Sequence, residues 1–295
     1  MNMSNKRDKN SEKTLKIVWF LGGLGNQMFQ YAFYKSLEHY FKNVKADISG
    51  FKNYPLHNGL ELERIFHLSV NKSSSFENVI LGGGNSLFAR ARRKISTLNR
   101  CYFEKKNFDP HIFENKKRTY YWGYWQSEKY FNHIADQIRT DFTFKNQLNE
   151  KNLQVADAIA RTSAVSVHVR RGDYVNHSVL GGVCDTEYYR KAIDHINSKV
   201  PDATYFIFSD DIAWCKEHLG IENCHYIDWN KEKESYIDMQ LMSLCKHNII
   251  ANSSFSWWGA WLNSNPEKIV IAPSKWHNEE ICDINDIIPN KWTRI

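Results

Sequence analysis

The chain has 295 residues, 42% of them hydrophobic and 24% charged, with a formal net charge of +6. This length suits two domains with sizeable cores, and no apolar run reaches the roughly 20 residues that span a bilayer. The six cysteines show neither CxxC pairs nor zinc-type spacings, so we expect reduced thiols. The charged segment 1–13 is expected to be flexible, and no signal-peptide apolar region follows it, which indicates a cytoplasmic protein.

A βαβ unit opens the amino-terminal half. LKIVWFL reads as a buried strand, GGLGNQ as its turn, QMFQYAFYKSLEHYF as a largely buried helix and NVKADIS as a second strand. Residues 14–150 are therefore expected to form a Rossmann-like domain. Between 51 and 115 the apolar periodicity decides little.

The GGLGNQ turn has two readings. A glycine-rich turn before a helix presents backbone donors to an anion, and Asp47 stands about where a dinucleotide fold places its ribose-binding acid. An NAD-linked oxidoreductase is therefore the alternative reading. Two features argue against it. Met28 stands where the GxGxxG pattern of dinucleotide-binding turns has its third glycine, and Asn26 and Gln27 add side-chain amides to the turn.

Two later stretches of the same half are distinctive in composition. Segment 90–106, RARRKISTLNRCYFEKK, carries seven basic residues and one acid. It suits anionic lipid headgroups, a lipid-diphosphate acceptor or plain solvent, and no nucleic-acid fold signature accompanies it. Segment 120–131, YYWGYWQSEKYF, reads as domain core or as flat faces for sugar rings, in which case Trp125 and Gln126 are the expected contacts.

The second half, residues 151–295, alternates strands with helices. Strands are expected at 164–170, 204–208, 225–227, 248–251 and 268–271, and helices at 186–199, 212–218, 235–247 and 255–263. Five such strands predict a doubly wound parallel sheet. Ligands of these sheets bind beyond the carboxyl ends of the strands, where five polar residues fall, namely His168, Arg170, Ser209, Asp210 and Asn252.

The segment AVSVHVRRGDY, 164–174, has residues that suit an anion-binding site. Side chains two apart in a strand share a face, so His168 and Arg170 converge on one site. A guanidinium matches a phosphate bidentately, and two arginines at a strand end suit a leaving diphosphate. An ordinary surface ion pair with Asp173 is the competing interpretation.

Two further stretches carry candidate contacts. In NSSFSWWGAWL, Asn252, Ser253 or Ser254 can cap a helix whose first amides are open to a phosphate, whereas the tryptophans read as packing. Asp238 lies among apolar neighbours in SYIDMQLMSLC, and a helix-capping role, an ion pair or the N1 and N2 donors of guanine would satisfy it. One of Asp210 and Asp211 is expected to cap the next helix, leaving the other for a ribose or base.

Five segments, in this order along the chain, resemble the inverting α-1,2-fucosyltransferases of glycosyltransferase family eleven: GGLGNQMFQYA, GYWQSEKYF, HVRRGDY, FSDD and NSSFSWWGAWL. The resemblance implies a GT-B-like α/β fold with two facing Rossmann-like domains and a cleft between them. The first domain would be on the acceptor side, and the second would bind GDP-fucose.

The resemblance also implies the reaction. L-Fucose would move from GDP-β-L-fucose to the 2-hydroxyl of a terminal galactose, with inversion and through an oxocarbenium-like transition state. Arg170 is expected at the β-phosphate, with Arg171 in support, and Asp173 is the candidate general base, with Asp185 and Glu187 as alternates. The remaining donor contacts are expected from His168, Asp210, Asp238, Asn252, Ser253, Ser254, Phe255 and Asn26. Acceptor contacts are expected from Gln27, Trp125 and Gln126.

Cofactors and partners follow from the same reading. The sequence contains no DxD triplet, so no metal is expected, and arginines with helix amino termini would take up the diphosphate charge. The partners are GDP-fucose and a galactose-terminated oligosaccharide, free or lipid-linked, without nucleic acid. Segment 90–106 is the candidate for contact with the inner face of the cytoplasmic membrane. O-antigen or other surface-glycan synthesis is the expected setting. A non-catalytic sugar-nucleotide or glycan-binding protein is the other alternative, against which the intact HVRRGDY argues.

Overall fold

The computed structural model describes residues 14–84, 87–95, 99–279 and 281–295. The segment 1–13, predicted to be flexible, lies outside the described residues. The chain divides into two compact units, Met1–Thr143 and Phe144–Ile295, and each is described by itself. The chain enters the second unit at Phe144, a few residues before the domain change that the sequence places after residue 150.

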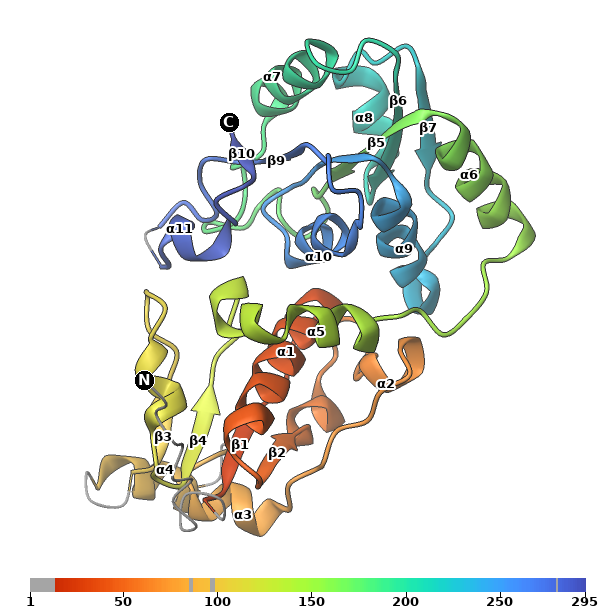
Figure 1. The fold of residues 1–295 in the computed structure, drawn as a ribbon. Coiled ribbons are helices and arrows are strands. Elements are labelled where there is room, and N and C mark those ends of the chain that lie inside the picture. The colour runs from red at the N-terminus through yellow and green to blue at the C-terminus, as the bar shows by residue number, and fades with distance from the viewer. Residues whose placement is uncertain (1–13, 85–86, 96–98, 280) are drawn as a thin grey trace, which may run out of the picture. The chain divides into compact units, whose positions relative to one another are not determined.

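The first unit is built on a parallel sheet (Figure 1). Its strands lie in the order β2-β1-β4-β3, and each neighbouring pair is parallel. The bounds are β1 Lys16–Trp19, β2 Val44–Asp47, β3 Cys101–Phe103 and β4 Thr119–Trp122. Helix α1, Leu24–Tyr40, connects β1 to β2 and completes the predicted βαβ unit.

The turn before α1 is shorter than predicted. The helix begins at Leu24, so Asn26 and Gln27 lie in its first turn and not before it. Gly22 makes the turn possible because its φ of +100° is accessible only to a residue without a side-chain carbon. The Gln27 backbone N–H already donates to the Gly23 carbonyl at 3.0 Å, which closes the first helical turn.

In the stretch between 51 and 115, where periodicity decides little, the described residues form short helices and one edge strand, β3. Ser74 begins α3 with a reciprocal capping box with Glu77, a local signal that does not depend on periodicity. The described helices of this stretch have at most eight residues, which leaves little room for an apolar repeat. The helical bounds are η2 Ser49–Asn53, α2 Leu62–Ile65, α3 Ser75–Ile80, α4 Leu87–Lys94, η3 Pro110–Glu114, η4 Glu128–Tyr130, η5 Asn132–Ile134 and α5 Ala135–Asp141.

The second unit has a larger parallel sheet, with strand order β10-β9-β8-β5-β6-β7. The bounds are β5 Ser163–Val169, β6 Ala203–Ser209, β7 Cys224–Ile227, β8 His247–Ile249, β9 Val270–Ala272 and β10 Thr293–Arg294. The five predicted strands are present, and β10 adds a sixth of only two residues. The order reverses at β5, which lies between β6 and β8, so the ends of β5 and β8 form the topological switch point.

Helices cover both faces of this sheet (Figure 1). Their bounds are α6 Glu150–Arg161, α7 Thr186–Asn197, α8 Ile212–His218, η6 Glu232–Glu234, α9 Tyr236–Leu244, α10 Ser254–Leu262 and α11 Ile284–Ile287. On one face, Tyr189 of α7, Cys215 of α8 and Val167 of β5 belong to one buried hydrophobic cluster. On the other, Asn248 of β8 bonds the Ser166 hydroxyl and the Met242 carbonyl of α9. The strand register thereby directs successive β5 side chains to different helix layers.

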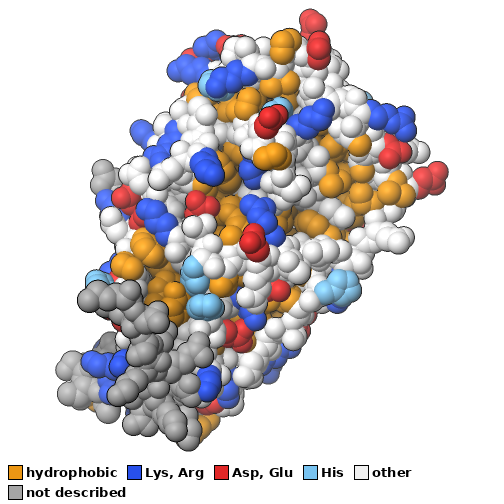
Figure 2. Space-filling view, viewed as in Figure 1, with side chains coloured by type: hydrophobic (Ala, Val, Ile, Leu, Met, Phe, Trp, Pro, Cys, Tyr) orange, Lys and Arg blue, Asp and Glu red, His pale blue; other side chains and the backbone are white. Residues whose placement is uncertain are grey.

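The charge of the molecule is mixed over the face shown in Figure 2, where Lys, Arg, Asp and Glu side chains are interspersed with apolar ones on the second unit. Among the residues that the structure describes, no helix is long and apolar enough to cross a membrane.

Candidate active site

The predicted contacts of the second unit gather at the switch point of its sheet. Arg170 directly follows β5, and Asn252 and Ser253 follow β8, the neighbouring strand. Asp210 follows β6 on the other side of β5. Carboxyl ends of parallel strands meet at one edge, which is where such sheets bind their ligands.

His168 is a buried polar group at this edge of the sheet. It is 6% exposed, and its ring lies 5.8 Å from the ring of Phe255, centroid to centroid. Burial and the neighbouring Arg170 charge lower the pKa of His168 to about 3, so its imidazole is neutral at physiological pH. Within the described residues Nδ1 has no hydrogen-bond partner. A buried, unpartnered ring nitrogen is costly in the protein alone and is available to a ligand.

Arg170 is held by two carboxylates. Its Nη2 lies 2.8 Å from Asp173 Oδ1, and its Nη1 lies 3.0 Å from Asp210 Oδ2. The Arg170 side chain is 31% exposed, so part of it remains open to solvent. The ion pair with Asp173, which is the competing interpretation of this segment, is therefore present. It does not exclude an anion-binding site, because it holds the guanidinium in one orientation.

Arg171 points to the other face of the strand end. Its Nε lies 3.1 Å from Asp211 Oδ2, and its guanidinium stands 4.3 Å above the ring of Trp214 on α8. Asp211 also caps α8, accepting the Trp214 backbone N–H at 3.1 Å, and this bond is the main reason why its pKa is lowered. Asp211 is thus the predicted cap, and Arg171 supports the loop and the helix.

Asp210 joins the two arginines. Besides its ion pair with Arg170, it accepts the Arg171 backbone N–H at 2.9 Å. A side-chain carbon at Gly172 would lie 2.9 Å from Asp210 Oδ2, so only glycine lets the carboxylate approach the loop this closely. The contact with a ribose or base predicted for Asp210 stays a prediction, while in the structure this carboxylate holds the loop.

The start of α10 lies next to Arg170. Ser253 is the cap, and its hydroxyl accepts the Phe255 backbone N–H at 3.3 Å and bonds the side chain of Tyr174. Asn252 is buried, and its amide donates to the carbonyls of Leu180 and Trp276 at 3.1 Å each. Asn252 therefore ties two loops together. Ser254 and Phe255 are half-buried at the first turn of the helix, and the tryptophans of α10 are buried packing, as predicted.

Asp238 on α9 is half-buried, and burial raises the pKa of its carboxyl group to about 7. Asn230 donates to Asp238 Oδ1 at 2.8 Å, and a pair of amide hydrogen bonds holds Asn230 against Asn152. The structure therefore fixes Asn230 as the partner of Asp238. No sequence pattern indicates this network, because its amides are spread over distant loops and helices.

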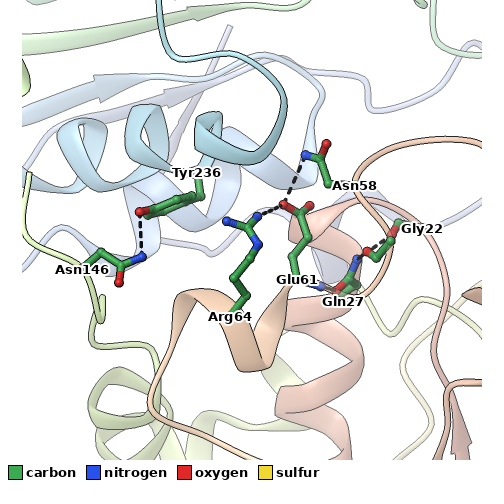
Figure 3. A network of polar contacts seen from close by, with 8 residues as sticks. Gly22, Gln27, Asn58, Glu61, Arg64, Asn146 and Tyr236 are labelled. Carbon is green, nitrogen blue, oxygen red and sulfur yellow. Dashed lines mark hydrogen bonds and ion pairs between the residues drawn. The ribbon is translucent and has the colours of Figure 1, made fainter. Parts of the chain in front are cut away.

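The predicted contacts of the first unit take different positions. Gln126 donates to Asn26 Oδ1 at 2.7 Å, so these two form a pair. The Gln27 side chain is fully buried, donates to the carbonyls of Gly22 and Gly59, and accepts the Glu61 backbone N–H (Figure 3). An acceptor contact by Gln27 would require this turn to open, so the structure assigns it a structural role. Asn58 and Arg64 bond the Glu61 carboxylate beside it (Figure 3).

Trp125 corrects a prediction. It was expected to contact a sugar ring if segment 120–131 is a binding surface, but it is fully buried and stacks on Phe33 with centroids 4.0 Å apart. The alternative reading of that segment, domain core, is right for this residue. Asp47 also has a structural role, because it is 1% exposed and its carboxylate accepts a hydrogen bond from the Tyr120 hydroxyl at 2.6 Å. It cannot also bind the ribose of a dinucleotide.

The alternate bases lie at the start of α7. Asp185 caps the helix through the Tyr188 backbone N–H at 2.8 Å. Glu187 is exposed and paired with Arg190 and Lys191, whose hydrogen bonds hold the pKa of Glu187 at about 2. All three candidate carboxylates therefore have protein partners, because Asp173, 55% exposed, is itself paired with Arg170. The choice of Asp173 as the base stays a prediction.

A pocket of about 270 Å³ opens beside the two arginines. Its lining includes several residues that were not singled out from the sequence, namely Tyr174, Leu180, Cys184, Trp214 and His218. Tyr174 belongs to the HVRRGDY segment itself, and its aromatic ring lies 5.7 Å from the Arg170 guanidinium. That adjacency in sequence was the one signal that could have found it.

The sequence matches glycosyl transferase family 11 over residues 2–295. The chain belongs to this family. Its relatives include an alpha-1,2-colitosyltransferase of Escherichia coli, 37% identical over 96% of this chain and 99% of the relative. The O-antigen biosynthesis glycosyltransferase WbnK of Escherichia coli is 32% identical over 86% of this chain and 92% of its own. Human galactoside alpha-(1,2)-fucosyltransferase 1 is 30% identical over 48% of this chain and 42% of its own.

Solved structures agree on the fold. NodZ, an alpha-1,6-fucosyltransferase, superimposes with a TM-score of 0.52 at 16% identity, covering 86% of this chain and 97% of NodZ. FUT1 of Arabidopsis thaliana in complex with GDP gives a TM-score of 0.52 at 12% identity, covering 90% of this chain and 72% of FUT1. The family eleven protein is thus a glycosyltransferase with a GT-B fold, made of two parallel-sheet α/β units.

Proposed function

We propose that this glycosyltransferase moves L-fucose from GDP-β-L-fucose to the 2-hydroxyl of a terminal galactose, with inversion, during synthesis of an O-antigen or other surface glycan. One observation carries the proposal. Asp173 and Asp210 hold the Arg170 guanidinium at the switch point, beside the start of α10. The relatives named for α-1,2 transfer and O-antigen synthesis support the linkage and the setting.

The donor would lie along the carboxyl edge of the second sheet. Arg170 and the first backbone amides of α10 would take up the diphosphate charge, which is greatest as GDP departs. The free Nδ1 of His168 would bond the nucleotide, and Asp238 would accept the N1 and N2 donors of guanine beside Asn230. With these charges supplied by the chain, the transfer is proposed to need no metal.

Asp173 would act as the general base. The acceptor 2-hydroxyl oxygen would attack the anomeric carbon of fucose, the bond to the β-phosphate oxygen would break, and the hydroxyl proton would pass to the carboxylate. The Arg170–Asp173 ion pair, 2.8 Å long, must loosen or share its charge when a diphosphate binds. A diphosphate on Arg170 would then release Asp173 for the acceptor.

The acceptor side is assigned to the first unit, where Gln126 and Asn26 form a polar pair. A galactose-terminated oligosaccharide, free or lipid-linked, is the proposed acceptor. The buried Gln27 and Trp125 would act through the backbone that they hold, and not by direct contact.

Colitose is the second candidate for the transferred sugar. The observation that favours it is the 37% identity to the alpha-1,2-colitosyltransferase over nearly the whole of both chains. Colitose is fucose without the 3-hydroxyl group, so the bond formed and the diphosphate site would be the same. The preference for fucose or colitose depends on whether the protein has a polar group that bonds the 3-hydroxyl of fucose, because colitose would leave such a group unpaired.

The test is transfer by the purified chain from GDP-fucose and from GDP-colitose, in separate and competing reactions, to lactose, N-acetyllactosamine and lipid-linked oligosaccharides. Higher kcat/KM with GDP-fucose and an α-1,2 product supports the proposal. Preference for GDP-colitose transfers the assignment to the second candidate. Tight GDP binding without transfer to any acceptor would identify a non-catalytic sugar-nucleotide-binding protein.

A further inference from the structure

Helix α4 presents its apolar side chains to solvent. Leu87, Phe88 and Ile95, the residue after the helix, are 84%, 61% and 49% exposed. Leu87 and Ile95 lie two turns apart and share one side of the helix with Ala91, which is also exposed. A helix that serves a domain core turns its apolar side inward, so this orientation is reversed.

The inward side of α4 is held by a small residue and a cation. Ala89 is fully buried, and the Arg93 guanidinium donates to the carbonyls of Gly82 and Gly84 and lies 5.8 Å from the Trp122 ring. These contacts fix the rotation of the helix about its axis. The exposure of Leu87 and Phe88 is therefore a consequence of how α4 is anchored.

Cations surround the exposed apolar residues. Arg90 and Lys94 are exposed on α4, and Arg100 is exposed further along the chain. The sequence has no acid from Asn78 to Phe103. The next acid, Glu104, is turned inward, where it accepts the Tyr124 backbone N–H at 2.7 Å. Leu87, Phe88, Arg90, Lys94 and Ile95 form what we call the α4 outer face.

We propose that the α4 outer face docks on an anionic membrane surface. An apolar stripe bordered by arginine and lysine matches the boundary between acyl chains and negatively charged headgroups. Leu87 and Ile95, which can neither stack on a base nor form a hydrogen bond with one, distinguish this surface from a nucleic-acid site. The attachment does not depend on which sugar the enzyme transfers.

Two other occupants fit the surface less well. The amino-terminal segment 1–13 carries four basic and two acidic residues and, besides its methionines, no large apolar side chain. It would bring positive charge to a positive face. A second copy docked face to face would likewise bring Arg90 and Lys94 against their own counterparts.

The test is flotation of the full chain with vesicles of phosphatidylglycerol and phosphatidylethanolamine, compared with vesicles of phosphatidylcholine alone. The wild type should bind the anionic vesicles and bind them less at high salt. The double variant Arg90→Gln/Lys94→Gln should bind about 25-fold more weakly, since each cation near such a surface contributes about fivefold. Leu87→Ser/Phe88→Ser should lose about tenfold or more for each apolar side chain removed.

The matched control is Leu153→Ser/Leu244→Ser, which removes two half-exposed leucines from the second unit. It should bind vesicles as the wild type does. All four proteins should transfer sugar to a soluble acceptor at the same rate, which verifies that the α4 variants are folded.

Three outcomes would overturn the proposal. In the first, the wild type does not bind anionic vesicles. In the second, the α4 variants bind as tightly as the wild type. In the third, the face has another occupant. Either sedimentation shows a dimer that the Leu87→Ser/Phe88→Ser substitutions dissociate, or a duplex nucleic acid binds in an Arg90-dependent manner while vesicles do not bind. The third result would assign the face to a second copy or to nucleic acid.

Discussion

Asp210 Oδ2 lies 3.0 Å from Nη1 of Arg170 and fixes this guanidinium before any ligand is bound. The carboxylate comes from the end of β6 and the arginine from the end of β5, strands paired in register up to Val169 and Ser209. The sheet therefore sets the position of the anion-binding site. Such preorganisation means that the protein does not have to rearrange when charge develops on a leaving diphosphate.

Arg170→Ala should abolish transfer and greatly weaken GDP binding. The diphosphate would lose its bidentate partner, and Asp173 and Asp210 would be left to repel it. Loss of one preorganised donor typically lowers kcat by about 100-fold to 1,000-fold. Arg170→Lys should be nearly as impaired, since an ammonium cannot reproduce the planar fork. Initial rates and calorimetric titration with GDP provide the measurements.

Arg190→Ala is the control for this pair. Arg190 is an exposed arginine of α7 that also contacts two carboxylates, Glu187 and Asp194. It should retain wild-type rates and GDP affinity. Near-normal turnover in Arg170→Ala would remove the basis of the proposed donor site.

Asp173→Asn should lower the rate while leaving GDP affinity nearly intact. A base acts on the acceptor and not on the nucleotide, and general-base contributions are typically about 100-fold to 10,000-fold. Single-turnover rates and GDP titrations separate the two effects. Asp194→Asn, at another exposed acid paired with an arginine, is the matched control.

Two results would contradict a base at position 173. If GDP binding and turnover collapse together, Asp173 orients Arg170 and the ion pair is its whole role. If neither changes, either the base is another group or the departing phosphate accepts the proton itself.

Asp210 should behave as a positioning residue. Asp210→Ala removes both the ion pair to Arg170 and the acceptor of the Arg171 backbone N–H, and it should raise KM for the donor as well as lower kcat. Asp210→Asn keeps an oxygen for the Arg171 amide, so it should recover part of the loss. Equal damage by both substitutions would mean that Asp210 contacts the donor itself.

Asp238 should give the protein a pH-dependent stability. Burial raises its pKa from 3.8 to about 7, so the folded state holds the proton more tightly than the unfolded chain. The stability contributed by the protonated form is complete below about pH 4 and is lost as the pH rises through about 7. Asp238→Asn removes this loss and should unfold at a higher temperature than the wild type near pH 8, with a difference of at least about 1.4 kcal/mol, the value of one pKa unit.

The stability difference between Asp238→Asn and wild type should shrink as the pH is lowered toward about 4, where both side chains are neutral. Asp202→Asn, at an exposed acid, should show no such trend. The same Asp238→Asn protein should bind GDP more weakly, because an amide cannot accept both guanine donors. A thermal stability difference that does not vary with pH would show that folding does not raise the pKa of Asp238.

Transfer activity should survive chelation. Arg170 and the start of α10 are proposed to carry the charge that a metal would otherwise neutralise. The rate measured in EDTA should match the rate in magnesium or manganese to within a small stimulation, which would reflect faster GDP release. Full loss in EDTA, restored by a divalent ion, would require a metal site at the diphosphate.

The sequence predicted local features better than those that depend on distant partners. The helix predicted over 212–218 is α8, Ile212–His218, because a polar cap and an apolar repeat mark it locally. Strand β10 has only two residues and no pattern to read. Trp125 could not be placed, because an aromatic residue looks the same in a core and on a sugar-binding surface until its partner Phe33 is known.

In the candidate site, too, local features could be predicted better than features that depend on distant partners. His168 and Arg170 could be placed together because the strand period fixes their common face. The roles of Asp210 and Asn252 could not be read, because each bonds groups brought in by other strands and loops. Asn230 went unnoticed for that reason too.

The caps of the second unit have a further consequence. Of the five helices that follow strands of this sheet in the described residues, α7, α8 and α11 are capped by aspartates, and α9 has Asp238 in its first turn. Only α10, with Ser253 as its cap, has no acid at either place. The chain thus places an acid at the start of four of these helices and none at the start of α10. An anion that diffuses along this edge meets a single attractive helix end, so the serine cap also selects where a phosphate can rest.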